Sequence, residues 1–126
     1  MDKNRGCCSL LRELDLSNNK LATLSDATFN GLYNLETLDL RGNTFRQVPT
    51  IGLKPLKKLD ILDLSNNPEL QKIPNSAFSH NKGLVTLRLQ GCRLTSINSG
   101  AFSSLGIILL AIFIYLFLVY NFGLRN

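Results

Sequence analysis

A leucine pattern repeated at a fixed interval constrains this chain more than any other feature of its sequence. The segment from Leu11 to Leu21 reads L-x-x-L-x-L-x-x-N-x-L, and similar copies begin at Leu35, Leu59 and Leu84. The copies are displaced by 24, 24 and 25 residues, and the third has one extra residue before its last leucine. Four copies in register predict an array of similar coils, each formed by one repeat.

Each copy has the spacing of a short strand. Leu14 and Leu16 are two residues apart, so their side chains point to the same side of an extended segment. One coil cannot bury its apolar face alone, and stacking several coils gives a parallel sheet over a continuous core. A residue after each strand is expected to bond backbone groups of neighbouring turns, which would otherwise be unpaired. These ladder residues are Asn19, Asn43, Asn67 and Cys92.

The segments between the strands also follow a pattern. Phenylalanine recurs at one fixed place, as Phe29, Phe78 and Phe102. Leu53 takes that place in the second coil, so the sequence predicts an aromatic stack on the convex side that is interrupted there.

Together these motifs resemble those of leucine-rich-repeat proteins, in the 24-residue form common in extracellular members such as Toll-like receptor ectodomains. The resemblance covers residues 8–105. It implies an α/β solenoid, an arc with short parallel strands on the concave face and an irregular or short helical convex side. The motif is specific for the fold and says little about the partner.

Repeat proteins usually bind through their concave surface, so we expect the partner there. The middle column of outward residues on that face runs Asp15, Asp39, Asp63, Arg88. It is either an acidic strip for a basic ligand or a cation, or the common filler of a Leu-Asp-Leu motif. The predicted contact residues on the central strands are Asp39, Arg41, Asp63 and Arg88.

Residues 1–8 contain no apolar stretch of signal-peptide length. Because Cys8 falls where Leu32 and Leu56 fall in later copies, we interpret residues 1–8 as the tail of a preceding coil or an uncapped N-terminus. Residues 9–104 then form the repeat domain, of about four repeats. Either this is a partial chain from a longer array, or a partner covers the open first coil.

The composition changes abruptly at Leu105. Residues 105–124 contain no charged side chain, and as a helix they would be roughly 30 Å long, which matches a bilayer core. The sequence predicts one apolar C-terminal transmembrane helix there and a short tail at 125–126; the alternative is a malformed fifth coil. Arg125 favours extracellular or lumenal repeats, whereas the missing signal peptide favours a tail-anchored protein with cytosolic repeats.

Charge and motifs argue against several function classes. The net charge is +5, from 14 basic and 9 acidic residues that are dispersed along the chain, so we predict no nucleic-acid partner. No phosphate loop, zinc spacing or usable histidine occurs, since the lone His80 lies in a polar turn. We therefore predict no enzyme activity, no catalytic or metal-binding residue and no cofactor. Three cysteines leave at least one unpaired within the chain, and Cys92 is interpreted as a ladder residue in preference to half of a disulfide.

The sequence thus predicts a single-pass, membrane-tethered, receptor-like module that recognises a protein ligand or co-receptor on its concave strand face. The alternative is a soluble or tail-anchored cytosolic scaffold or regulatory protein, whose apolar C-terminus docks on a partner or a membrane.

Overall fold

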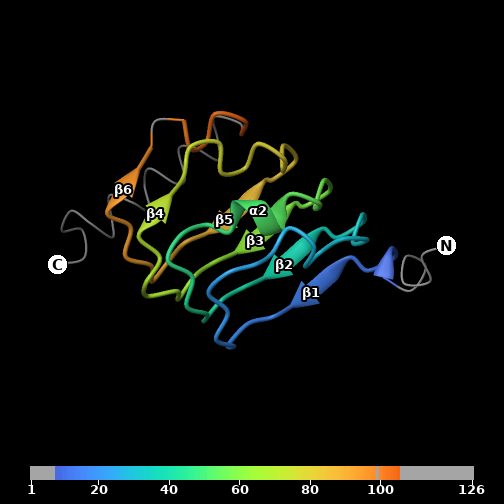
Figure 1. Ribbon diagram of the computed structural model, residues 1–126, viewed down its shortest axis with the longest axis horizontal. Helices are drawn as coiled ribbons and strands as arrows, with labels where there is room; N and C mark the ends of the chain where they lie inside the picture. The colour runs from blue at the N-terminus through green and yellow to red at the C-terminus, as the bar shows by residue number, and fades with distance from the viewer. Residues whose placement is uncertain (1–7, 99, 106–126) are drawn as a thin grey trace.

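Successive coils of the chain each contribute one strand to a parallel sheet (Figure 1). The computed structural model describes residues 8–98 and 100–105. The main sheet contains four strands, which lie side by side in chain order: β1 (Glu13–Asp15), β2 (Thr37–Asp39), β3 (Ile61–Asp63) and β5 (Thr86–Arg88). The predicted solenoid with short parallel strands is confirmed.

Neighbouring strands pair in the register set by the repeat. Leu14 is opposite Leu38, Leu38 is opposite Leu62, and Leu62 is opposite Leu87. The extra residue of the third copy follows β3, so it does not shift this register, and Leu70 beyond it is fully buried.

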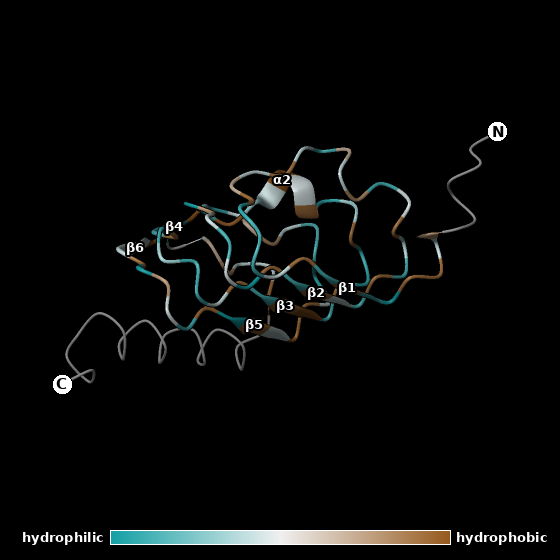
Figure 2. Ribbon diagram, turned by 90° about the horizontal axis from the view of Figure 1, so that it is seen from below, coloured by the Kyte–Doolittle hydropathy of each residue, from teal (hydrophilic) through white to brown (hydrophobic). Residues whose placement is uncertain are grey.

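A second, smaller sheet follows the turns and was not predicted. It pairs β4 (Lys72–Ile73) with β6 (Ser96–Ile97), and an isolated bridge joins Gln47 to Lys72. The convex side carries a helix of four residues, α2 (Thr50–Leu53). Figure 2 shows α2 on the opposite side of the molecule from the main sheet.

The core lies between these two sides and is most tightly closed in the middle coils. Leu38 and Leu62, at the centres of β2 and β3, are fully buried. Their counterpart in the first coil, Leu14, is only half-buried, and Leu11 is 38% exposed. The first coil has a described neighbour on one side only, which accounts for the difference.

The convex side of the core contains the phenylalanines. The rings of Phe78 and Phe102 stack with centroids 6.1 Å apart and planes 8° from parallel. Phe29 is also buried, but fully buried Leu53 stands in the coil between Phe29 and Phe78. The aromatic stack is interrupted at the coil where the sequence placed a leucine.

Asn67 pairs backbone groups of two coils with one side chain. Its amide nitrogen donates to the carbonyls of Leu64 (2.9 Å), Ser65 (3.3 Å) and Leu40 (3.1 Å). Its amide oxygen accepts the N–H of Phe45 at 3.3 Å. Both polar ends of this buried amide are therefore used, and it links the second coil to the third.

The other ladder positions differ in how many coils they join. Asn43 repeats the pattern of Asn67, donating to Leu16 O at 3.1 Å and accepting Leu21 N–H at 3.0 Å. Exposed Asn19 donates within its own coil, to Leu16 O at 2.9 Å. The buried thiol of Cys92 donates to Leu64 O at 3.1 Å and forms no disulfide.

The buried thiol makes stability depend on alkaline pH. Desolvation raises the pKa of Cys92 from 9.0 to about 11. Between these two pH values the unfolded chain binds fewer protons at this residue than the folded chain, so stability falls as the pH rises. We expect a loss of up to about 2 kcal/mol across this window, absent in Cys92→Asn. Urea unfolding of both proteins at several pH values measures the difference. Equal pH dependence in the two proteins would contradict this assignment.

The residue before each ladder residue has a left-handed backbone conformation, with positive φ. Asparagine and glycine alternate at this position from one coil to the next. The four residues are Asn18 (φ 58°), Gly42 (φ 69°), Asn66 (φ 55°) and Gly91 (φ 73°). A Cβ atom added to Gly42 would lie 2.2 Å from Asn18 Oδ1, and one added to Gly91 would lie 2.4 Å from Asn66 Oδ1. The amide of each asparagine thus occupies the space beside the glycine of the next coil, so a larger residue there would require this exposed side chain to move. Glycine also adopts the positive φ without strain.

Asn81 is a buried polar residue that the sequence analysis did not single out. It stands at the repeat position of Leu32 and Leu56 and is 1% exposed. Its amide nitrogen donates to Leu53 O and Leu56 O, each at 2.9 Å. This second amide bridge ties the third coil to the second on the convex side.

The predicted transmembrane helix at 105–124 and the tail at 125–126 lie outside the described residues, except for Leu105. The same is true of residues 1–7. Within residues 8–98 and 100–105, no helix is long and apolar enough to cross a membrane.

Candidate binding surface on the concave face

The four predicted contact residues lie together on the central strands. Asp39 and Asp63 are opposite each other at the ends of β2 and β3, and Asp63 is opposite Arg88 on β5. Arg41 follows β2 by two residues. One small area of the concave face therefore holds two carboxylates and two guanidinium groups.

Asp39 is engaged by its own coil. One carboxylate oxygen accepts the backbone N–H of Arg41 at 3.1 Å, and the other lies 3.1 Å from the guanidinium of Arg41. The Asp39 carboxylate thus caps the turn after β2 and orients the Arg41 side chain above it.

Asp63 is buried and links two strands. Its Oδ1 accepts the backbone N–H of Ser65 at 3.0 Å and the Ser65 hydroxyl at 2.6 Å. Its Oδ2 lies 3.8 Å from Arg88 Nη1 on the neighbouring strand. A carboxylate with 12% of its side chain exposed would lose solvation without these partners.

Asp15 repeats the same turn in the first coil. Its Oδ1 accepts the backbone N–H of Ser17 at 2.9 Å. Hydrogen bonds from the Ser17 side chain and backbone, together with the charge of Arg41, hold the pKa of Asp15 below its ordinary value. The three aspartates therefore act as strand-end caps, which favours the interpretation of Leu-Asp-Leu as a structural filler. Among the described residues, no cluster of three histidine, cysteine or acidic side chains could hold a metal ion.

The two arginines are the charged groups of this area that remain open to a partner. Their side chains are 47% exposed at Arg41 and 49% exposed at Arg88. Each guanidinium has five N–H donors, of which a contact to one carboxylate oxygen uses few. Half-buried Thr37, Ile61 and Thr86 form the outward column at the other end of the same strands. The area therefore presents two oriented guanidinium groups beside a column of uncharged side chains.

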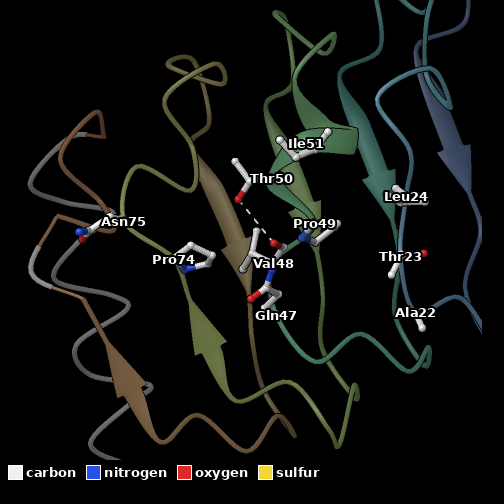
Figure 3. A pocket seen from close by; sticks show the side chains of 10 residues that line it. All are labelled: Ala22, Thr23, Leu24, Gln47, Val48, Pro49, Thr50, Ile51, Pro74 and Asn75. Atoms are coloured by element: carbon white, nitrogen blue, oxygen red, sulfur yellow. Dashed lines mark hydrogen bonds between the residues drawn. The ribbon is translucent and has the colours of Figure 1, made fainter.

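Sequence reasoning missed a hollow on the flank of the array, with a volume of about 310 Å³. Figure 3 shows its lining from three coils: Leu24 on one side, Val48 to Ile51 in the middle, and Pro74 with Asn75 on the other. Proline follows the inward apolar residue in two successive coils, at Pro49 and Pro74, which is the sequence signal for this hollow.

Comparison with known proteins gives a family and several relatives. The family model described as leucine rich repeat matches residues 9–68 and 58–109. Human leucine-rich repeats and immunoglobulin-like domains protein 1 is 31% identical over 120 residues, covering 77% of this chain and 11% of that protein. Chicken Tsukushi is 35% identical over 88 residues, covering 69% of this chain and 24% of its own length. Mouse Podocan is 44% identical over 87 residues, with 68% and 14% covered.

A solved structure is also similar in part. The crystal structure of a TLR13–ssRNA13 complex aligns with a TM-score of 0.44 and 23% identity, covering 75% of this chain and 20% of that one. The chain spans between about a tenth and a quarter of the length of the three relatives.

Proposed function

The chain belongs to the leucine-rich repeat family, and from that premise we propose that it is a module that binds a partner protein through its concave strand face. The observation that carries the proposal is the pair of half-exposed guanidinium groups, Arg41 and Arg88, each oriented by a buried or half-buried aspartate. Arginine is enriched among the residues that dominate protein interfaces, because it combines a planar donor group with a long apolar stem.

The preorganised arginines favour binding a folded protein surface. A side chain held by an ion pair loses little rotamer freedom when a partner arrives, so less of the contact energy is lost on binding. The uncharged column of Thr37, Ile61 and Thr86 provides a contact surface that excludes water from around the charged contacts. We propose a binding role with no catalytic step.

We further propose that the protein is located at a membrane or outside the cell, tethered through residues 105–124. The absence of charge over that stretch and the family resemblance support this location. Protease protection of intact microsomes carrying an N-terminally tagged protein tests it, after washing with alkaline carbonate. If the protein stays in the membrane and its tag is protected from the protease, the result supports the tether and a lumenal repeat array. A cleaved tag on a retained protein indicates cytosolic repeats, and a protein removed by carbonate has no tether.

Reversing the charge of both arginines should weaken partner binding without unfolding the array. In Arg41→Glu/Arg88→Glu we expect at least about a tenfold loss of binding, because interface arginines typically contribute more than 1 kcal/mol each. A photo-crosslinking amino acid at Thr86 on β5 of the full chain, expressed in cells, measures the yield of a discrete crosslinked species. The same amino acid at Asn30, on the convex side, shows whether crosslinking is confined to the concave face.

The matched control is Lys20→Glu/Arg93→Glu. Lys20 and Arg93 are exposed, directly follow ladder residues and form no ion pair among the described residues. This control changes the net charge by the same amount and should keep the crosslink. If Arg41→Glu/Arg88→Glu melts early, the arginines are structural and the surface assignment is wrong. An unchanged crosslink in a folded variant would also overturn it.

A further inference from the structure

The turns that lead into β3 and β5 carry a cluster of exposed lysines, which we call the lysine ridge: Lys54, Lys57, Lys58 and Lys82. None of these lysines forms an ion pair with a described residue. All four ion pairs in the described parts of the chain are made by arginines, on the strands or at the coil turns. No described carboxylate therefore lies within ion-pair distance of a ridge lysine.

The repeat brings these lysines together from two coils. Lys57 and Lys82 each precede the first leucine of a strand motif by two residues, so they occupy the same place in adjacent coils. Paired strands of adjacent coils lie about 4.8 Å apart. Lys57 Nζ is 3.4 Å from His80 Nδ1, and Lys58 Nζ donates to Asn34 Oδ1 at 2.8 Å, which extends the ridge onto the first coil.

The local electrostatics agree with a concentrated positive charge. Desolvation and then the charges of Lys57, Lys54 and Lys82 lower the pKa of His80 below its ordinary value. Lys54 and Lys57 also line an open hollow of about 420 Å³ with Pro55, Asn30 and Asp26. Asp26 is the one carboxylate in that lining, and it forms no ion pair with either lysine in the described structure.

We propose that the lysine ridge binds a linear sulfated polysaccharide. Lysine ammonium groups are compact point charges, suited to isolated sulfate groups along a chain. Nucleic acid is disfavoured, because no arginine in the ridge supplies planar, bidentate recognition, and Tyr33 is the one large aromatic side chain among the exposed hydrophobic residues described. Lys57, Lys58 and Lys82 precede β3 and β5, whereas Asp63 and Arg88 lie at the other ends of these strands, so the ridge is separate from the predicted concave contact residues. Because sulfated polysaccharides are extracellular, this proposal rests on the location outside the cell proposed above for the repeats.

Binding of a size-defined heparin oligosaccharide to the full chain in detergent micelles tests this assignment. In Lys57→Gln/Lys82→Gln we expect a loss on the order of tenfold in affinity near physiological salt, since two of the four cations that attract the sulfate groups are removed. The salt dependence should also become shallower, because fewer counterions are released. Calorimetry at several salt concentrations measures both quantities.

The matched control is Lys20→Gln/Arg93→Gln, which removes the same number of charges from the net +5, at the turns after the ladder residues of the first and fourth copies. It should change the affinity less than about threefold, an expectation based on screening of separated surface charges. Equal losses of affinity in the two variants would show that only the net charge matters, which would contradict a binding site at the lysine ridge. Tighter binding of single-stranded RNA, or of vesicles containing phosphatidylserine, would overturn the choice of ligand. No partner protein enters this assay, so its failure is distinct from failure of the concave site.

Discussion

Asn67→Ala should lower the free energy of unfolding by about 2–4 kcal/mol, because one buried backbone N–H loses its acceptor and the hydrogen bonds from the amide to the carbonyls of two coils are lost. The alanine variant leaves the buried N–H of Phe45 without its acceptor. The carbonyls of Leu40 and Leu64 also lose a donor, but they keep the hydrogen bonds from Asn43 and Cys92. Each unsatisfied buried group costs about 1–3 kcal/mol. Against a typical total stability of about 5–15 kcal/mol, this loss is large. Urea unfolding followed by circular dichroism measures it.

Asn19→Ala is the control for that prediction. Asn19 has the same place in the repeat, but it is exposed and bonds carbonyls of its own coil only. We expect a loss below about 1 kcal/mol, because water can replace the amide there. Similar losses at Asn19 and Asn67 would show that the bridge between coils is not the source of the stability.

Phe78→Ala is the second large effect, with an expected loss of about 3–5 kcal/mol. Phe78 is fully buried and stacks on Phe102 in the next coil. Removing the ring opens a cavity in the convex side of the core and also removes the stacking contact with the Phe102 ring. Thermal and urea unfolding of the variant measure the loss.

Phe78→Leu provides the matched comparison, since leucine already fills this repeat position in the preceding coil. Leu53 is fully buried there. We expect Phe78→Leu to cost less than half of the alanine loss, because a smaller cavity remains. Equal losses for leucine and alanine would mean that the stack with Phe102, and not the filled volume, determines the stability of this position.

The sequence could predict the coils because their period is fixed by residues that must be buried. Leu14, Leu38, Leu62 and Leu87 are partners in the sheet since every inward leucine is displaced by one whole coil. The grouping of Asp39, Asp63 and Arg88 follows from the same register. Periodicity of this kind is read directly from spacing.

Features that depend on one coil alone were not predictable from the repeat. Asn81 looks like an ordinary turn residue until the fold shows it buried at a leucine position, with two carbonyls in reach of its amide. The two-residue strands β4 and β6 are too short to show any alternation in sequence. The distinction between a free acidic strip and three capped aspartates needed the Ser17, Arg41 and Ser65 hydrogen bonds themselves.

The alternation of asparagine and glycine before the ladder residues gives the turns of this array a pattern that repeats every two coils. The side chains of Asn18 and Asn66 occupy the space that a Cβ atom on Gly42 or Gly91 would need. Removing the coil that contains Gly42 would bring Asn18 next to Asn66, and one of these two exposed side chains would have to turn away. Removing or inserting two coils keeps the order of asparagine and glycine. Changes in steps of two repeats should therefore disturb these turns least.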